Sequence, residues 1–176
     1  NASTGLLTWK EVHKDSPTED GLGGAHSVIV SPDGDHVYVA GYDDDAVVVF
    51  SRNASSGLLT WEEWHQDSLA ENGLDGAYSV AVSLDGDNVY VTGRTEDTVA
   101  VFSRDGTSGL LTWDEAHKDS ASLDGLDGAR SVMVSPDGEN VYVASEFSQA
   151  VAVFNRDGIT GELAFSQADE NAPGLE

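Results

Sequence analysis

The chain has 176 residues, and its 32 Asp and Glu residues outnumber its 8 Lys and Arg residues, for a formal net charge of −24 at pH 7. So negative a field repels phosphate backbones and anionic lipid surfaces, which excludes nucleic acid as an expected partner. Cysteine is absent, which excludes disulfides, thiolate metal sites and a cysteine nucleophile. No apolar stretch approaches the roughly 20 residues of a membrane-spanning helix, so no membrane span is expected.

The first recognisable element is the pentapeptide Gly-Leu-Leu-Thr-Trp at residues 5–9, which returns 52 residues later at 57–61 and again at 109–113. Recurrence at a fixed period is the signature of a repeat architecture, in which each copy is one supersecondary unit. We therefore interpret residues 1–176 as a single partial domain made of three repeats, at 5–56, 57–108 and 109–160, with incomplete copies at 1–4 and 161–176.

Within the first copy the pattern predicts four β-strands. Residues 27–30 and 37–40 are short β-branched runs, and the Pro-Asp-Gly between them at 32–34 is typical of a tight turn, so this pair forms a hairpin. A third strand is expected at 46–51 and a fourth at 58–65. Four strands per repeat at a period near 50 residues are typical of propeller blades, so we expect an all-β β-propeller fold with three four-stranded antiparallel blades.

The two ends of the chain both carry a copy of the fourth strand. Residues 1–16 repeat it without the three strands that precede it elsewhere, so we expect an extra outer strand at the N-terminus. The last copy, near 163–167, is weaker, with Glu162, Phe165 and Asp169 where the other copies have Leu, Trp and His. The two strands are therefore expected to compete for one position.

Three blades cannot close a ring, because propellers have about 4–8 blades. An open stack exposes sheet edges and apolar blade faces, which proteins normally cover. We expect the ring to be completed either by a homodimer of six blades, with the N-terminal strand exchanged between chains, or by a longer parent chain.

The repeat carries the strings Thr-Gly-x-Leu, Ser-Pro-Asp-Gly, Val-Tyr-Val-Ala and Val-x-Val-Phe, which begin in the first copy at Thr4, Ser31, Val37 and Val47. In these strings it resembles the seven-bladed β-propeller lactonase family, which includes 6-phosphogluconolactonases and carboxymuconate-lactonising enzymes. The resemblance covers essentially the whole chain and implies the propeller fold.

The third repeat carries the closest match to the family's site motifs. Its Ala-Arg-Ser at 129–131 and its Ser-Glu at 145–146 resemble the family's Pro-Arg-His and Asn-Glu. The resemblance implies that Arg130 binds the carboxylate or phosphate of a substrate and that Glu146 takes part in proton transfer. Two positions depart from the family pattern, because Ser131 stands in place of His and Ser145 in place of Asn.

Because the three repeats are near copies, the positions at which they differ indicate candidate sites. One such position precedes the first strand and one follows the second, and together they hold His26, Tyr78, Arg130, Tyr42, Arg94 and Glu146. In a propeller both loops lie at one end beside the channel, so we expect these six residues to surround one channel mouth and to bind a ligand. His26 is the candidate general base. There are two alternatives. Loop positions without a packing role can vary in sequence without any function, and His26 can be a hydrogen-bonded residue that takes no part in catalysis.

The residues that recur in every repeat are expected to be structural. Each of three histidines follows a Glu by two residues in a separate blade, which favours hydrogen bonds over a shared metal ion: His13, His65 and His117. Turn aspartates are expected to pair with arginines at the same blade end: Asp33, Asp85 and Asp137 with Arg52, Arg104 and Arg156. Three tryptophans suit blade packing better than sugar stacking: Trp9, Trp61 and Trp113.

No cofactor and no metal site are expected. The acidic run at 43–45 is the one place where a hard cation such as calcium is considered, because calcium prefers several oxygen ligands. The run lacks the spacing of a calcium loop, so solvation is the favoured interpretation.

Two functions remain open from the sequence. The favoured one is a non-catalytic binding or scaffold module, multivalent and lectin-like or a surface protein, because repeated identical units make repeated identical sites for a small molecule or carbohydrate. The alternative is a lactonase-like enzyme that acts on a small anionic lactone through Arg130, Glu146 and His26, with one asymmetric pocket. We expect a secreted, cell-surface or periplasmic location.

Overall fold

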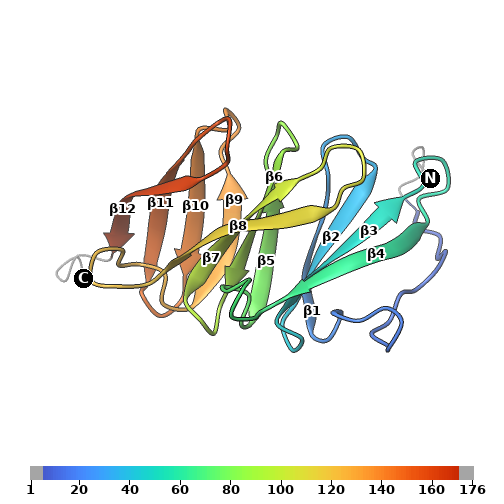
Figure 1. Cartoon of the computed structure of the whole chain (residues 1–176), viewed down its shortest axis with the longest axis horizontal. Coiled ribbons are helices and arrows are strands. Elements are labelled where there is room, and N and C mark those ends of the chain that lie inside the picture. The colour runs from blue at the N-terminus through green and yellow to red at the C-terminus, as the bar shows by residue number, and fades with distance from the viewer. Residues whose placement is uncertain (1–5, 171–176) are drawn as a thin grey trace.

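The computed structural model describes residues 6–170, with side chains up to Ala168, and its strands form three four-stranded antiparallel sheets in a row (Figure 1). Blade 1 consists of β1 (Ala25–Val30), β2 (His36–Gly41), β3 (Ala46–Arg52) and β4 (Leu59–Gln66). Blade 2 consists of β5 (Ala77–Val82), β6 (Asn88–Gly93), β7 (Thr98–Arg104) and β8 (Leu111–Lys118). Blade 3 consists of β9 (Ala129–Val134), β10 (Asn140–Ser145), β11 (Ala150–Arg156) and β12 (Leu163–Glu170).

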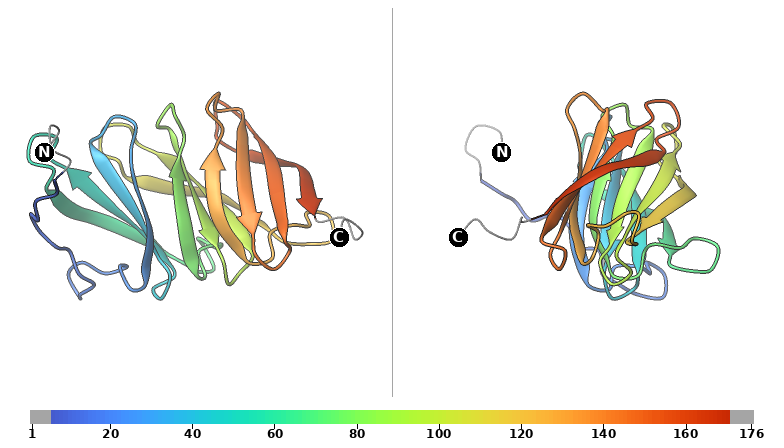
Figure 2. Two further views of the ribbon diagram at one scale, coloured as in Figure 1. Left: turned by 180° about the vertical axis from the view of Figure 1, so that it is seen from behind. Right: turned by 90° about the vertical axis from the view of Figure 1, so that its left-hand side faces the viewer.

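The predicted blades are confirmed, each with its strands in chain order from the inner edge outward. The inner strands β1, β5 and β9 are neighbours, and Figure 2 shows the row of sheets from behind and along its length. The predicted copy at 1–4 and the end of the copy at 161–176 lie outside the described residues. In the described range no helix is long and apolar enough to cross a membrane.

The turn between β1 and β2 shows why the Ser-Pro-Asp-Gly string recurs. The Ser31 hydroxyl donates to the Asp33 carboxylate at 2.5 Å and accepts the His36 amide at 3.0 Å, while Asp33 accepts the Asp35 amide at 3.0 Å. Gly34 has φ of +81°, a conformation that favours glycine. One short side chain thus closes the hairpin, and the same bonds recur in blades 2 and 3.

The apolar core lies between consecutive blades. Blade 1 offers Tyr38, Val47 and Val49, which are fully buried against Val89 and Phe102 of blade 2. The equivalent residues one repeat later bury the interface between blades 2 and 3. Burial of each large apolar side chain contributes roughly 1.5–3 kcal/mol, so each blade is stabilised chiefly by its neighbours.

A buried arginine joins each pair of blades. Arg104 of blade 2 donates to the Tyr38 hydroxyl and to the Asp33 carboxylate of blade 1, both at 2.6 Å, and to the Gly86 carbonyl at 2.8 Å. The Tyr38 hydroxyl in turn donates to the Gly109 carbonyl at 2.8 Å. We call this set the arginine latch. Its counterpart between blades 2 and 3 consists of Arg156, Tyr90, Asp85, Gly138 and Gly161.

The arginine latch confirms that turn aspartates pair with these arginines and shows that each of the two observed pairs joins adjacent blades. Sequence reasoning placed them at the same end of a blade and left their burial open, and an exposed ion pair would contribute only about 0–1 kcal/mol. The structure puts the partners in adjacent blades, and the side chain of Arg104 is only 2% exposed. Loss of one partner from a buried pair is much more costly, because it leaves an unpaired buried charge or hydroxyl.

The N-terminal segment differs from the expected outer strand. Residues 6–15 form no strand, although they lie along blade 1. There the Glu11 carboxylate accepts the Leu59 amide at 2.6 Å and the His13 ring packs edge-on against Phe50 at 5.2 Å. A strand needs an unpaired neighbour to extend its sheet. The equivalent neighbour, β11, lies at the far end of the row and already pairs with β12 (Figure 1).

The recurring histidines make the expected structural contacts, as do Trp61 and Trp113, but not Trp9. His65 lies 2.8 Å from a Glu71 carboxylate oxygen and 3.3 Å from one of Glu63. The indole of Trp61 is partly buried and donates to the Asp20 carbonyl at 3.3 Å. The packing expected of Trp9 is not observed: its side chain is 79% exposed, because none of the described blades lies behind its segment.

Gly73→Ala is expected to lower the free energy of unfolding by about 1–3 kcal/mol. Gly73 has φ of +111°, and an added Cβ would lie 2.8 Å from the Ala116 Cβ. Gly106→Ala is the matched control, since no atom lies within 4 Å of its added Cβ. Urea unfolding of both variants measures the difference, and equal stabilities would contradict the prediction.

Candidate functional site

The six candidate residues form one contiguous cluster at one end of the blades, which we call the mouth cluster. Three of them are the second residues of the inner strands β1, β5 and β9, namely His26, Tyr78 and Arg130. The other three directly follow β2, β6 and β10, namely Tyr42, Arg94 and Glu146. An antiparallel hairpin puts the start of its first strand beside the end of its second, so both sets lie at the same end.

Each inner-strand member of the mouth cluster occupies a β-bulge. The pairing of β1 with β2 shifts between Ala25 and Ser27, at His26, and the other two blades shift at Tyr78 and Arg130. A bulge adds one residue to one strand and re-aims its side chain, and bulges are common beside active sites. Sequence reasoning missed these bulges. The available signal was the glycine two residues before each bulge: Gly24, Gly76 and Gly128, all with positive φ.

One half of the mouth cluster is aromatic. The rings of His26 and Tyr78 stack with centroids 4.3 Å apart and an interplanar angle of 22°. Tyr42 turns its edge to both, at 5.5 Å from His26 and 6.1 Å from Tyr78. The His26 side chain is exposed and borders a cavity of about 140 Å³.

The other half is charged. A single Glu146 carboxylate oxygen lies 2.8 Å from Arg94 Nη2 and 3.1 Å from Arg130 Nε. The Arg130 guanidinium lies 5.3 Å from the centre of the Tyr78 ring, so the two halves are joined by a cation–π contact. One carboxylate thus faces two cations, and the site keeps a net positive charge inside a strongly negative protein.

The ion pairs set the protonation of Glu146. The hydrogen bond from Arg94, aided by the charge of Arg130, holds the pKa of the Glu146 carboxyl below its usual range. A carboxylate that stays ionised is a weak proton acceptor and a good counter-ion. Two buried polar atoms beside it, Arg94 Nε and Ser145 Oγ, have no hydrogen-bond partner in the described part of the chain.

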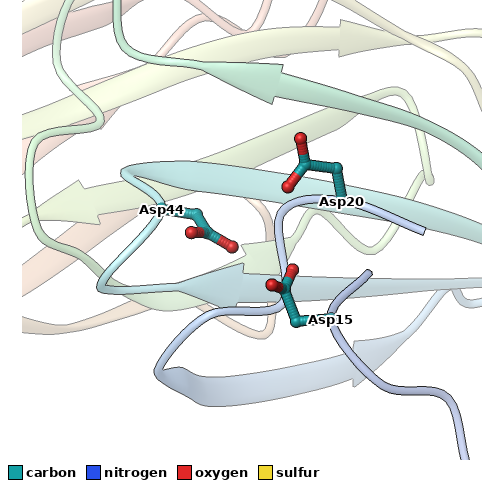
Figure 3. Close-up of side chains that lie close together, drawn as sticks. All are labelled: Asp15, Asp20 and Asp44. Carbon is teal, nitrogen blue, oxygen red and sulfur yellow. The ribbon is translucent and has the colours of Figure 1, made fainter. Parts of the chain in front are cut away.

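A second acidic group lies outside the mouth. Asp15 and Asp20, from the N-terminal segment, approach Asp44 from the turn between β2 and β3, with carboxylate oxygens within 4.8 Å (Figure 3). Burial, with the Asp15 charge, raises the pKa of the Asp44 carboxyl. The predicted solvation of the acidic run is incomplete, because Asp44 accepts the Gly23 amide at 2.6 Å and Asp45 accepts the Gly76 amide at 2.8 Å. That this acidic group holds no metal ion stays a prediction.

Comparison with known proteins places the chain in a family. A model of "Lactonase, 7-bladed beta-propeller" matches residues 65–175, more than half of the chain. The chain belongs to the seven-bladed β-propeller lactonase family. This membership confirms the resemblance found in the repeat strings, and no curated protein matches the chain.

Solved structures agree with this membership. The periplasmic gluconolactonase PpgL of Pseudomonas aeruginosa is 29% identical with a TM-score of 0.74, over 88% of this chain and 42% of that protein. A Bacteroides fragilis protein provisionally named a 6-phosphogluconolactonase is 24% identical with a TM-score of 0.73, over 85% and 40%. The latter likeness shows the fold alone. The lactonase-family chain therefore spans about 40% of the length of these proteins.

Proposed function

We propose that this chain is part of a lactone-hydrolysing propeller whose anionic substrate binds at the mouth cluster. The observation that carries the proposal is the pair of guanidinium groups that share the single carboxylate of Glu146. Family membership and the likeness to a periplasmic gluconolactonase support the lactonase-like enzyme, which the sequence analysis left open as the alternative. They do not support the binding module that it favoured.

The shape of the site also supports an enzyme. A multivalent binding module would present an equivalent site in each blade. The mouth cluster instead draws a different residue from each repeat and joins them in one asymmetric group. No observation favours a lectin or scaffold role, and export to the surface or periplasm stays a prediction.

The roles follow from the geometry. Arg94 and Arg130 bind the carboxylate or phosphate of the substrate, because guanidinium groups match these oxyanions with paired hydrogen bonds. His26 accepts a proton from a water molecule that attacks the lactone carbonyl. The ring C–O bond then breaks, and the leaving alkoxide takes up that proton, so that lactone and water give a hydroxy acid. Glu146 is a positioning residue that holds the two guanidinium groups.

Arg130→Gln is expected to raise KM for an anionic lactone about tenfold or more with little change in kcat, since a charged hydrogen bond contributes about 1.5–3 kcal/mol. His26→Gln is expected to lower kcat about 10²–10⁴-fold. Lys118→Gln is the control, because Lys118 is an exposed cation on the outer strand β8 that pairs with Glu96. Hydrolysis of a phosphorylated and a neutral aldonolactone by pH-stat measures all three.

Glu146→Gln separates the two possible roles of this residue. If Glu146 is only a counter-ion, the substitution leaves kcat nearly unchanged. If Glu146 transfers a proton, as the family resemblance implies, the substitution abolishes turnover. Absence of hydrolysis across a lactone panel, together with several equivalent binding sites in calorimetry, would overturn the enzyme proposal in favour of a binding module.

A further inference from the structure

Blade 2 carries two buried threonines that the other two blades lack. Thr92 in β6 and Thr98 at the start of β7 are fully buried, and the other repeats have alanine at both equivalent positions. A buried hydroxyl costs free energy unless it forms a hydrogen bond. The Thr98 hydroxyl donates to the Gly73 carbonyl at 2.8 Å, in the loop that leads into β5. Both threonines lie at the end of blade 2 that carries the mouth cluster.

Thr92 fastens the β-bulge at Tyr78. It is the pairing partner of Ser79, and its hydroxyl oxygen accepts the Ser79 amide at 3.0 Å. The neighbouring inner strands hold the same stretch from both sides, because Ser27 Oγ accepts an amide of β5 and Ser79 Oγ accepts an amide of β9, each at 3.3 Å. A bulge interrupts the regular ladder, so side-chain bonds of this kind determine where its extra residue points. The backbone that carries Tyr78 is thus held by all three blades.

The ring of Tyr78 has protein groups on both faces. His26 stacks on one face, with ring centres 4.3 Å apart. A face covered at that distance has no room for a second group. The guanidinium carbons of Arg130 and Arg94, at 5.3 Å and 5.9 Å from the ring centre, therefore lie over the other face. This order follows the strands, since β5 lies between β1 and β9 (Figure 1). A ligand has no free face of Tyr78 on which to stack.

We propose that Tyr78 is the positioning residue of the mouth cluster and that Thr92 holds it in place. This role rests on the proposed function, in which His26 accepts the proton. The ring of Tyr78 sets the separation between His26 and the two guanidinium groups. A lactone whose anionic group binds the guanidinium groups then presents its carbonyl to His26 at one distance. Such orientation acts on the rate of the chemical step, and a displacement of about 1 Å can cost about 10²-fold.

Proton NMR at constant pH tests the stack without a substrate. The ring current of Tyr78 shifts the ring protons of His26 upfield, because one ring lies over the face of the other. Tyr78→Leu is expected to move the His26 signals downfield. Tyr78→Phe is expected to leave them in place, because the ring faces make the contacts. His26→Gln identifies the signals by their loss.

Thr92→Ala tests the support of the ring. The other two repeats have Ala40 and Ala144 at this position, so the strand is expected to stay intact, which circular dichroism checks. The His26 signals are expected to move part of the way toward those of Tyr78→Leu, because the bulge loses a hydrogen bond. Thr112→Ala is the matched control, since Thr112 is an exposed threonine on β8 of the same blade. Signals that move equally in both variants, or in neither, would contradict the role of Thr92.

Steady-state kinetics separates positioning from ligand binding. Tyr78→Leu is expected to lower kcat for an anionic lactone about 10–100-fold. KM is expected to change less than about threefold, because Glu146 still holds both guanidinium groups. Tyr78→Phe is expected to keep most of kcat. A higher KM with unchanged kcat would show instead that Tyr78 binds the ligand, and would overturn the positioning role.

The proposed function and the positioning role fail in different experiments. If the unmodified chain hydrolyses no lactone, the proposed function is wrong, and the NMR signals still decide whether Tyr78 holds His26. If the His26 signals of Tyr78→Leu equal those of the unmodified chain, the positioning role is overturned, whatever the turnover.

Discussion

Arg104→Gln is expected to lower the free energy of unfolding by about 3–5 kcal/mol. The side chain of Arg104 is 2% exposed and donates to groups of both blades 1 and 2. Its loss leaves the buried hydroxyl of Tyr38 without its donor and the Asp33 carboxylate without its cation. Arg156→Gln in the next interface is expected to have a similar effect, because the same contacts recur there.

Arg52→Gln is the matched control for this prediction. Arg52 occupies the same repeat position and has only the Gly34 carbonyl as a partner in the described range. Its replacement is expected to cost less than about 1 kcal/mol, because the Arg52 side chain is only partly buried in the described structure. Urea unfolding followed by tryptophan fluorescence compares the three variants. Equal losses at Arg52 and Arg104 would show that burial between blades is not what gives the arginine latch its strength.

The second large effect is expected in alkali, where the chain should lose about 4 kcal/mol of stability between pH 10 and pH 12. Burial raises the pKa of Tyr38 and of Tyr90 to about 12 in the folded chain, against about 10 in the unfolded chain. The folded state therefore holds these two protons over that window while the unfolded state releases them. This stability is present below pH 10 and falls as the pH rises, by about 2 kcal/mol for each tyrosine between pH 10 and pH 12.

Unfolding free energies measured at several alkaline pH values, with tyrosinate absorbance as a parallel signal, test this expectation. The variant Tyr38→Phe/Tyr90→Phe removes both titrating groups, so its stability should depend much less on pH in the same window. Its absolute stability is also lower, because Arg104 and Arg156 lose a partner, so the slope rather than the value is compared. An unchanged slope would contradict the assignment to these tyrosines.

Comparison of the three repeats was enough to locate the residues of the mouth cluster. The three copies share their strand and turn residues, so the differing positions at 26, 78 and 130 stood out without any structure. Hairpin geometry then predicted that they lie with the residues after the second strand, and the six side chains do form one group. The sharing of Glu146 by two arginines was not predicted, because it depends on the spacing between blades 2 and 3.

The N-terminal segment shows that a strand-like sequence pattern does not by itself produce a strand. Residues 6–15 have the strand residues of β4 and β8, yet they form no strand, because a strand also requires an unpaired edge to bond. The acidic group formed by Asp15, Asp20 and Asp44 was missed for a related reason. It joins segments that are distant in sequence, and only the packing of the N-terminal segment on blade 1 brings them together.

By itself the sequence determined the blades: their number, the order of the strands, the turns and the positions at which the copies differ. These follow from local physics, since alternation of apolar residues selects strands and Asp-Gly turns select hairpins. Three features became visible only in the folded structure. They are the buried arginine latch between blades, the bulges that orient His26, Tyr78 and Arg130, and the carboxylate of Glu146 that two arginines share. Those features depend on how one sheet is rotated against the next, and side-chain packing across the interface sets that rotation.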